Sequence, residues 1–120
     1  MKDNQLVHLQ QGNCKPCEGG VAPLKRNEFQ PYLDAISGWN AVDEKKIEKD
    51  FKFKNFKEAL AFVDKVGEIA EKEGHHPDMY LHGWNKVKLT LSTHAIGGLS
   101  INDFILAAKV DQQSTITTLT

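Results

Sequence analysis

An amphipathic stretch between residues 56 and 73 places the strongest constraint on how this 120-residue chain can fold. Apolar side chains recur there at helical spacing, and Asn55 precedes them at the position of an N-cap. Gly74 stands where a glycine permits left-handed backbone, and Pro77 prevents the helix from continuing. We therefore expect a helix over 56–73 that holds His75 and His76 in the turn leaving it. Its predicted apolar face comprises Phe56, Ala59, Leu60, Val63, Val66, Ile69 and Ala70.

Two further helices are expected from capping signals. Asn27 resembles an N-cap for a short helix that ends before Gly38 and buries Phe29, Tyr32, Leu33 and Ile36. Ser100 and Asp103 form a Ser-x-x-Asp capping box that opens the last helix, with Ile101, Phe104, Ile105 and Ala108 on its apolar face.

Strand patterns fill the intervals between these helices. Residues 39–42 and 47–53 predict one hairpin, although Lys49 interrupts its alternation, and residues 80–84 and 87–93 predict two more strands. The order of helix, two strands, helix, two strands, helix indicates an α+β fold with a four-stranded antiparallel sheet and helices on one face.

The chain is expected to be a single domain with short extensions. Residues 1–26, rich in Gln, Gly, Asn and Pro, predict an irregular arm; residues 27–113 form the domain; residues 114–120 predict a flexible tail. A net charge of −1 gives no electrostatic case for binding nucleic acid or an anionic membrane. No apolar run approaches the roughly 20 residues of a membrane span, and no signal peptide is evident, so we expect a cytoplasmic protein.

Cys14 and Cys17 permit three interpretations: half of a zinc site, a redox dithiol, or two reduced thiols in a loop. A redox pair normally follows a buried strand and opens a helix, whereas polar and glycine residues surround this pair. Zinc would need further ligands from histidines some sixty residues away. We therefore favour two reduced thiols.

Three of the five histidines, His75, His76 and His94, lie at predicted ends of helices or strands, where functional sites are commonly built. Imidazole suits proton transfer near neutral pH. Each also has a simpler explanation: His75 as a helix cap, His76 as an exposed turn residue, and His94 as a surface residue. Adjacent histidines tend to point apart, which argues against a metal site.

Several motifs in sequence order resemble the pterin-4a-carbinolamine dehydratase family. They are Glu71-Lys72-Glu73-Gly74-His75-His76-Pro77, Trp84-Asn85-Lys86-Val87, Leu91-Ser92-Thr93-His94 and Gly98-Leu99-Ser100 through Asp103, with Gly38-Trp39-Asn40 and Phe51 to Phe56 upstream. The resemblance covers about residues 38–111.

The resemblance implies dehydration of 4a-hydroxytetrahydropterin to quinonoid dihydropterin, the step that recycles tetrahydrobiopterin after aromatic amino acid hydroxylation. It places the catalytic residues at His75, His94 and Asp103, and the substrate-binding residues at His76, Trp39 and Glu71. It implies no metal and no cofactor, because the pterin is itself the substrate. It also implies a homodimer or homotetramer that binds a small-molecule pterin; on the net charge alone, neither nucleic acid nor membrane is expected as a partner.

Two other functions remain open at this point. A protein-interaction module of the same fold would depend on an exposed apolar stripe of the last helix, between Ile101 and Val110. A zinc-binding module would use the cysteines. Apart from the resemblance, Trp39 and Trp84 are both expected in the core rather than as stacking platforms.

Overall fold

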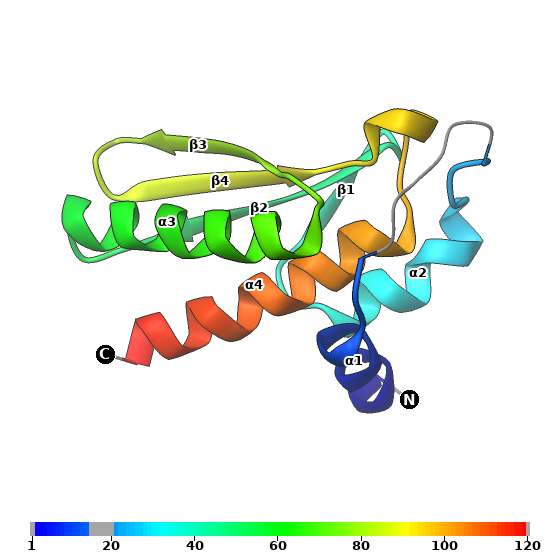
Figure 1. The fold of residues 1–120 in the computed structure, drawn as a ribbon, viewed down its shortest axis with the longest axis horizontal. Helices are drawn as coiled ribbons and strands as arrows, with labels where there is room; N and C mark the ends of the chain where they lie inside the picture. Colours follow the sequence, from blue (N-terminus) through cyan, green and yellow to red (C-terminus); the bar gives the residue numbers. More distant parts are fainter. Residues whose placement is uncertain (1, 15–20, 120) are drawn as a thin grey trace.

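The computed structural model describes residues 2–14 and 21–119 and has two layers, an antiparallel sheet and helices that cover one of its faces (Figure 1). The sheet has the strand order β1-β2-β4-β3, with β1 at Asn40–Val42, β2 at Lys46–Lys52, β3 at Asp78–His82 and β4 at Lys86–Leu91. The helices are α1 (Lys2–Gln11), α2 (Arg26–Ala35), α3 (Phe56–Glu73), α4 (Ile101–Leu119) and a short 3-10 helix, η1 (His94–Ile96). The predicted α+β fold is confirmed.

Helix α3 begins and ends where its capping residues predict. Asn55 Oδ1 accepts a hydrogen bond of 2.8 Å from the Glu58 backbone N–H, and Gly74 closes the helix in left-handed backbone with φ of 68°. The predicted apolar face is partly wrong. Phe56 and Leu60 are 48% and 42% exposed, whereas Phe62 is buried against the rings of Phe51 in β2 and of Phe53, which directly follows that strand. Aromatic packing across the layers therefore selects which stripe of α3 is buried.

The two hairpins form as predicted, with small differences at their ends. Ile47, Lys49 and Phe51 all point toward the helices, so Lys49 keeps the register of β2 and reaches Asp111 of α4 at 2.9 Å. Strand β3 stops at His82 rather than Trp84, because Gly83 and Trp84 both take positive φ, 56° and 59°, in the tight turn to β4. Trp84 is 61% exposed, so its predicted place in the core is wrong, whereas Trp39 is buried.

The arm predicted to be irregular contains helix α1. Its Leu9 is completely buried, and α1 packs against α4 and α2, so tertiary contact stabilises a helix whose own sequence pattern is weak. Helix α2 starts at Arg26, and the backbone N–H of Lys25 is capped by the Glu28 carboxylate at 2.8 Å, so Asn27 is not the N-cap.

Helix α4 also departs from the sequence-based prediction. It continues to Leu119, through the segment predicted as a tail, because each added residue extends a helix that is already anchored in the core. Residues 102–108 and Val110 are buried, which leaves no exposed apolar stripe over 101–110 for the interaction module considered above. Among residues 2–14 and 21–119, no helix combines the length and the apolar character required to cross a membrane.

Candidate functional site

His75 and Asp103 form the central contact of the candidate site. Gly74 ends α3, and the His75 backbone N–H still donates to the Ala70 carbonyl at 3.2 Å, so the ring is held just beyond the helix. His75 Nε2 lies 2.6 Å from Asp103 Oδ1. The Asp103 side chain is completely buried and that of His75 is 11% exposed. The His75 side chain is therefore largely enclosed, with only a small part exposed to solvent.

The second oxygen of Asp103 connects the site to β4 and to the start of α4. Asp103 Oδ2 accepts hydrogen bonds from the Thr93 hydroxyl at 2.9 Å and from the Ser100 backbone N–H at 3.0 Å. The latter is the capping-box contact expected from the sequence. Three donors from separate elements thus hold one buried carboxylate in a fixed orientation.

His94 lies next to this network in the chain. It opens η1 directly after Thr93, whose backbone pairs with Gly98 through a 2.8 Å hydrogen bond. Because Thr93 and His75 bind the two oxygens of the same carboxylate, the backbone at His94 is held at the same end of the sheet as His75. His94 is exposed, so its ring is accessible there.

His76 and Glu71 form a second, exposed pair beside the first. His76 Nε2 lies 2.8 Å from Glu71 Oε1, with side-chain exposures of 64% and 81%. The two adjacent histidines therefore have different carboxylate partners, one buried and one in solvent. This difference fits the expectation that adjacent rings point apart and make separate contacts.

Trp39 is not brought into this group of histidines. Its ring is buried against Phe51, and its indole N–H donates to Asp111 Oδ2 of α4 at 3.0 Å. Lys49 contacts the other oxygen of the same carboxylate. Burial outweighs these favourable contacts and raises the pKa of Asp111 above its ordinary value. The contacts of Trp39 explain a role in packing and give no support to the predicted contact with substrate.

The N-terminal arm is anchored two residues from His75. Glu73 accepts hydrogen bonds from the Cys14 backbone N–H at 2.9 Å and from Lys109 Nζ at 2.6 Å. Burial alone would raise the pKa of Glu73, but the contacts with Lys109 and Cys14 and the charge of Lys72 outweigh it and hold the pKa below its ordinary value. Cys14 Sγ also lies 3.5 Å from the Asn102 carbonyl oxygen, and Cys17 lies outside the described residues.

No group of three or more His, Cys, Asp or Glu side chains suited to holding a metal ion occurs within the described parts of the chain. The side chains in contact at the histidine site are imidazoles and carboxylates. Such a set can donate, accept and orient protons.

Sequence reasoning missed Thr93 and the part that Ser100 plays beyond capping. Thr93 is buried and its hydroxyl lies 2.8 Å from that of Ser100 as well as contacting Asp103. Its signal was available: the alternation of β4 places Thr93 on the core-facing side, where a hydroxyl needs a partner. The identity of that partner depends on how α4 packs, which alternation alone does not reveal.

The sequence is similar to those of known proteins. A family model described as pterin 4 alpha carbinolamine dehydratase matches residues 22–113. A protein of Alkaliphilus metalliredigens, provisionally named pterin-4-alpha-carbinolamine dehydratase, is 49% identical over 109 residues, covering 90% of this chain and 97% of its own. A protein of Rubrobacter xylanophilus with the same provisional name is 47% identical over 107 residues, covering 89% and 99%.

Solved structures agree on the fold. The crystal structure of a transcriptional coactivator/pterin dehydratase from Brucella melitensis is similar with a TM-score of 0.72 and 34% identity, over 77% of this chain and 98% of that one. A pterin dehydratase-like RuBisCO assembly factor of the alpha-carboxysome matches with a TM-score of 0.55 and 24% identity, over 64% and 89%, which extends the likeness in fold alone.

Proposed function

The chain belongs to the pterin 4 alpha carbinolamine dehydratase family, and on that premise we propose that it dehydrates 4a-hydroxytetrahydropterin to quinonoid dihydropterin in the recycling of tetrahydrobiopterin. The observation that carries this proposal is the 2.6 Å contact between His75 Nε2 and the buried Asp103 carboxylate. A carboxylate that orients an imidazole is a common arrangement for moving protons.

The reaction requires two proton movements. The C4a–O bond breaks, and the departing hydroxyl takes a proton and leaves as water. The N5–H bond also breaks, and its electron pair forms the C4a=N5 double bond of the product. Because one proton is gained by the leaving group and one is lost from N5, a pair of groups that each transfer a proton near neutral pH is sufficient.

His75 and His94 are the proposed proton-transfer pair. Asp103 can only accept a hydrogen bond as a carboxylate, so His75 Nε2 donates to it and neutral His75 keeps its lone pair on Nδ1. His94 is exposed at the same end of the sheet and supplies the second imidazole. Complete burial of Asp103 favours a positioning role in which it acts through His75 rather than on the substrate directly.

His76 is the proposed binding residue. The exposed Glu71 carboxylate orients its ring through a contact of 2.8 Å. A hydrogen bond that is equally strong in the ground state and the transition state lowers KM without raising kcat. His76 and the proton-transfer pair should therefore differ in which kinetic parameter they control.

Steady-state dehydration of a 4a-hydroxytetrahydropterin by His75→Ala, His94→Ala and His76→Ala variants tests the proposal. We expect the first two substitutions to lower kcat by roughly 10²-fold or more, a common size for general acid–base catalysis. His76→Ala should chiefly raise KM. His8→Ala, which removes an exposed histidine of α1, is the matched control and should leave both parameters unchanged.

Far-ultraviolet circular dichroism must be the same for all four variants, so that kinetic changes are not caused by unfolding. Absence of dehydration by the wild-type chain would refute the proposed activity. A loss of only a few fold in kcat for both His75→Ala and His94→Ala would instead refute the assignment of the proton-transfer pair.

A further inference from the structure

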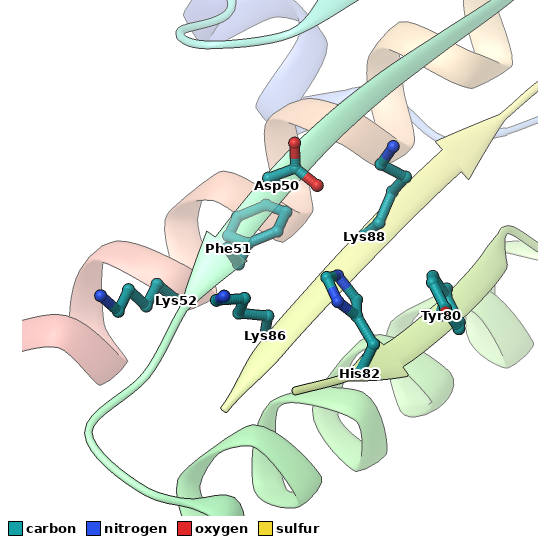
Figure 2. A pocket seen from close by; sticks show the side chains of 7 residues that line it. All are labelled: Asp50, Phe51, Lys52, Tyr80, His82, Lys86 and Lys88. Carbon is teal, nitrogen blue, oxygen red and sulfur yellow. The ribbon is translucent and has the colours of Figure 1, made fainter. Parts of the chain in front are cut away.

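The face of the sheet that the helices leave open is hollowed near the turn between β3 and β4 (Figure 2). The hollow has a volume of about 490 Å³, within the range of about 300–1,000 Å³ that small-molecule sites occupy. The side chains that define its chemistry are Asp50, Lys52, Tyr80, His82, Lys86 and Lys88. His75 and Thr93 lie beyond the other ends of β3 and β4, so this hollow is separate from the histidine site.

Positive charge is concentrated in the hollow. Lys52 and Lys86 are direct partners across β2 and β4, and Lys88 faces Asp50 one step further along the same pair of strands. Like charges directly opposite one another destabilise a sheet. In the described structure none of the three lysines is within ion-pair distance of a carboxylate. An anion bound between them would relieve this repulsion, although the whole chain carries a net charge of −1.

An aromatic wall stands beside the lysines. The rings of Tyr80 and His82 are stacked on β3 with centroids 4.6 Å apart and planes 15° apart, and Tyr80 is 62% exposed. Because His82 covers one face of the Tyr80 ring, a planar heterocycle would stack on the opposite face of this largely exposed side chain.

The positive region is short. Along the same face the next cross-strand row places Glu48 and Asp78 on either side of Thr90. These two carboxylates would repel a second phosphate that extended in their direction. The surface therefore suits a ligand with a single anionic group more than a continuous polyanion.

We propose that this hollow binds a mononucleotide, with its base stacked on Tyr80 and its phosphate held by Lys52, Lys86 and Lys88. Ammonium groups act as point charges toward phosphate, and three of them balance a dianionic group in the presence of Asp50. The site is independent of the proposed dehydratase activity, because it lies on the other face and at the other end of the sheet.

Isothermal titration calorimetry with adenosine 5′-monophosphate, adenosine and inorganic phosphate tests both halves of the ligand. We expect the mononucleotide to bind at one site per chain, about tenfold or more tighter than adenosine or phosphate alone, because only it uses lysines and ring together. Equal affinity for phosphate and mononucleotide, or no saturable binding, would overturn the proposal. So would affinity for single-stranded oligonucleotides that keeps rising with length, which would indicate a strand-binding surface.

Variants then locate the binding. Lys86→Gln and Tyr80→Ala should each weaken mononucleotide binding by about fivefold or more, whereas Lys57→Gln, an exposed lysine on α3, should leave it unchanged. Dehydration kinetics of Lys86→Gln should equal those of the wild type. Unchanged binding in both Lys86→Gln and Tyr80→Ala, with circular dichroism confirming that they fold, would show that the nucleotide binds elsewhere and overturn the assignment.

Discussion

At the scale of single residues, Asp103 carries two tasks with one side chain. Its Oδ2 caps α4 through the Ser100 N–H and receives the Thr93 hydroxyl, while its Oδ1 contacts His75. A capping acid normally lies at the surface, where replacing it changes stability by about 1 kcal/mol. Here the cap is buried, so the requirements of the helix fix the position of the carboxylate that orients the imidazole.

Two matched exchanges of carboxyl for amide separate the buried pair from the exposed one. Asp103→Asn should lower kcat by at least about tenfold with little change in KM, because the neutral amide no longer stabilises a protonated His75 ring. Glu71→Gln should change kcat by less than about twofold, because solvent surrounds the pair of Glu71 and His76. Steady-state kinetics measures both, and equal effects on kcat would contradict a special role for the buried carboxylate.

The sequence predicted those residues of the candidate site that lie next to a helix-capping or turn signal. Gly74 and Pro77 fixed the turn that holds His75, and the capping box marked Asp103. His75 and Asp103 are 28 positions apart in the sequence, and no local pattern specifies the contact between them. The contact of Thr93 with Asp103 and the hydrogen bond of Trp39 to Asp111 of α4 were missed for the same reason, because both depend on how a helix packs on the sheet.

At the scale of elements, α3 offers a direct test of the backbone that presents the histidines. Gly67 lies within the helix and Gly74 at its left-handed end, and a Cβ at either position would meet no atom within 4 Å. Gly67→Ala should therefore raise the free energy of unfolding by roughly 0.5–1 kcal/mol. Gly74→Ala should lower it by about 1 kcal/mol, because alanine is strained at positive φ. Urea denaturation distinguishes the two, and the same sign for both would contradict this account.

The anchor between the N-terminal arm and the helices predicts a dependence of stability on pH. The folded pKa of Glu73 lies below its ordinary value of 4.5, so its contribution is present above that pH and is lost as pH falls through the folded pKa. The raised pKa of Asp111 affects stability in the opposite direction, because protonation of this carboxyl group on acidification favours the folded state. Glu73→Gln should therefore flatten the loss of unfolding free energy below pH 4.5. Asp111→Asn should steepen the loss as pH falls toward 3.8, the ordinary pKa of that carboxyl group. Urea denaturation at a series of pH values measures both slopes.

Element boundaries could be predicted best where a side chain or glycine marks them. Asn55 and Gly74 mark the observed limits of α3. The end of β3 was predicted two residues too late, because no sequence signal announces a tryptophan with positive φ in the turn at Gly83 and Trp84. Helix α1 was missed because its stability comes from burying Leu9 between other helices. The local sequence pattern therefore predicted the elements that carry their own capping or turn residues, and it missed the helix that depends on packing against other helices.

At the scale of the whole molecule, the sheet formed by the described residues has an outer edge, β3, with which no other described strand pairs, and a second copy can cover it. β3 is the outer strand beside β4, and Met79 on it is 39% exposed. An uncovered edge presents unpaired backbone groups, and pairing with the same strand of another copy satisfies them with two-fold symmetry. The other edge, β1, has only three residues and offers less backbone for pairing.

We therefore expect the chain to self-associate through β3 at micromolar concentration, with a mass by light scattering of at least twice that of one chain. Met79→Lys places a charge on this edge and should raise the dissociation constant by about tenfold or more. Val7→Lys makes the same exchange at an apolar residue of α1 that is 46% exposed, and should leave association unchanged. A wild-type chain that is only monomeric at these concentrations would exclude the dimer, and equal weakening by both lysines would place the interface away from β3.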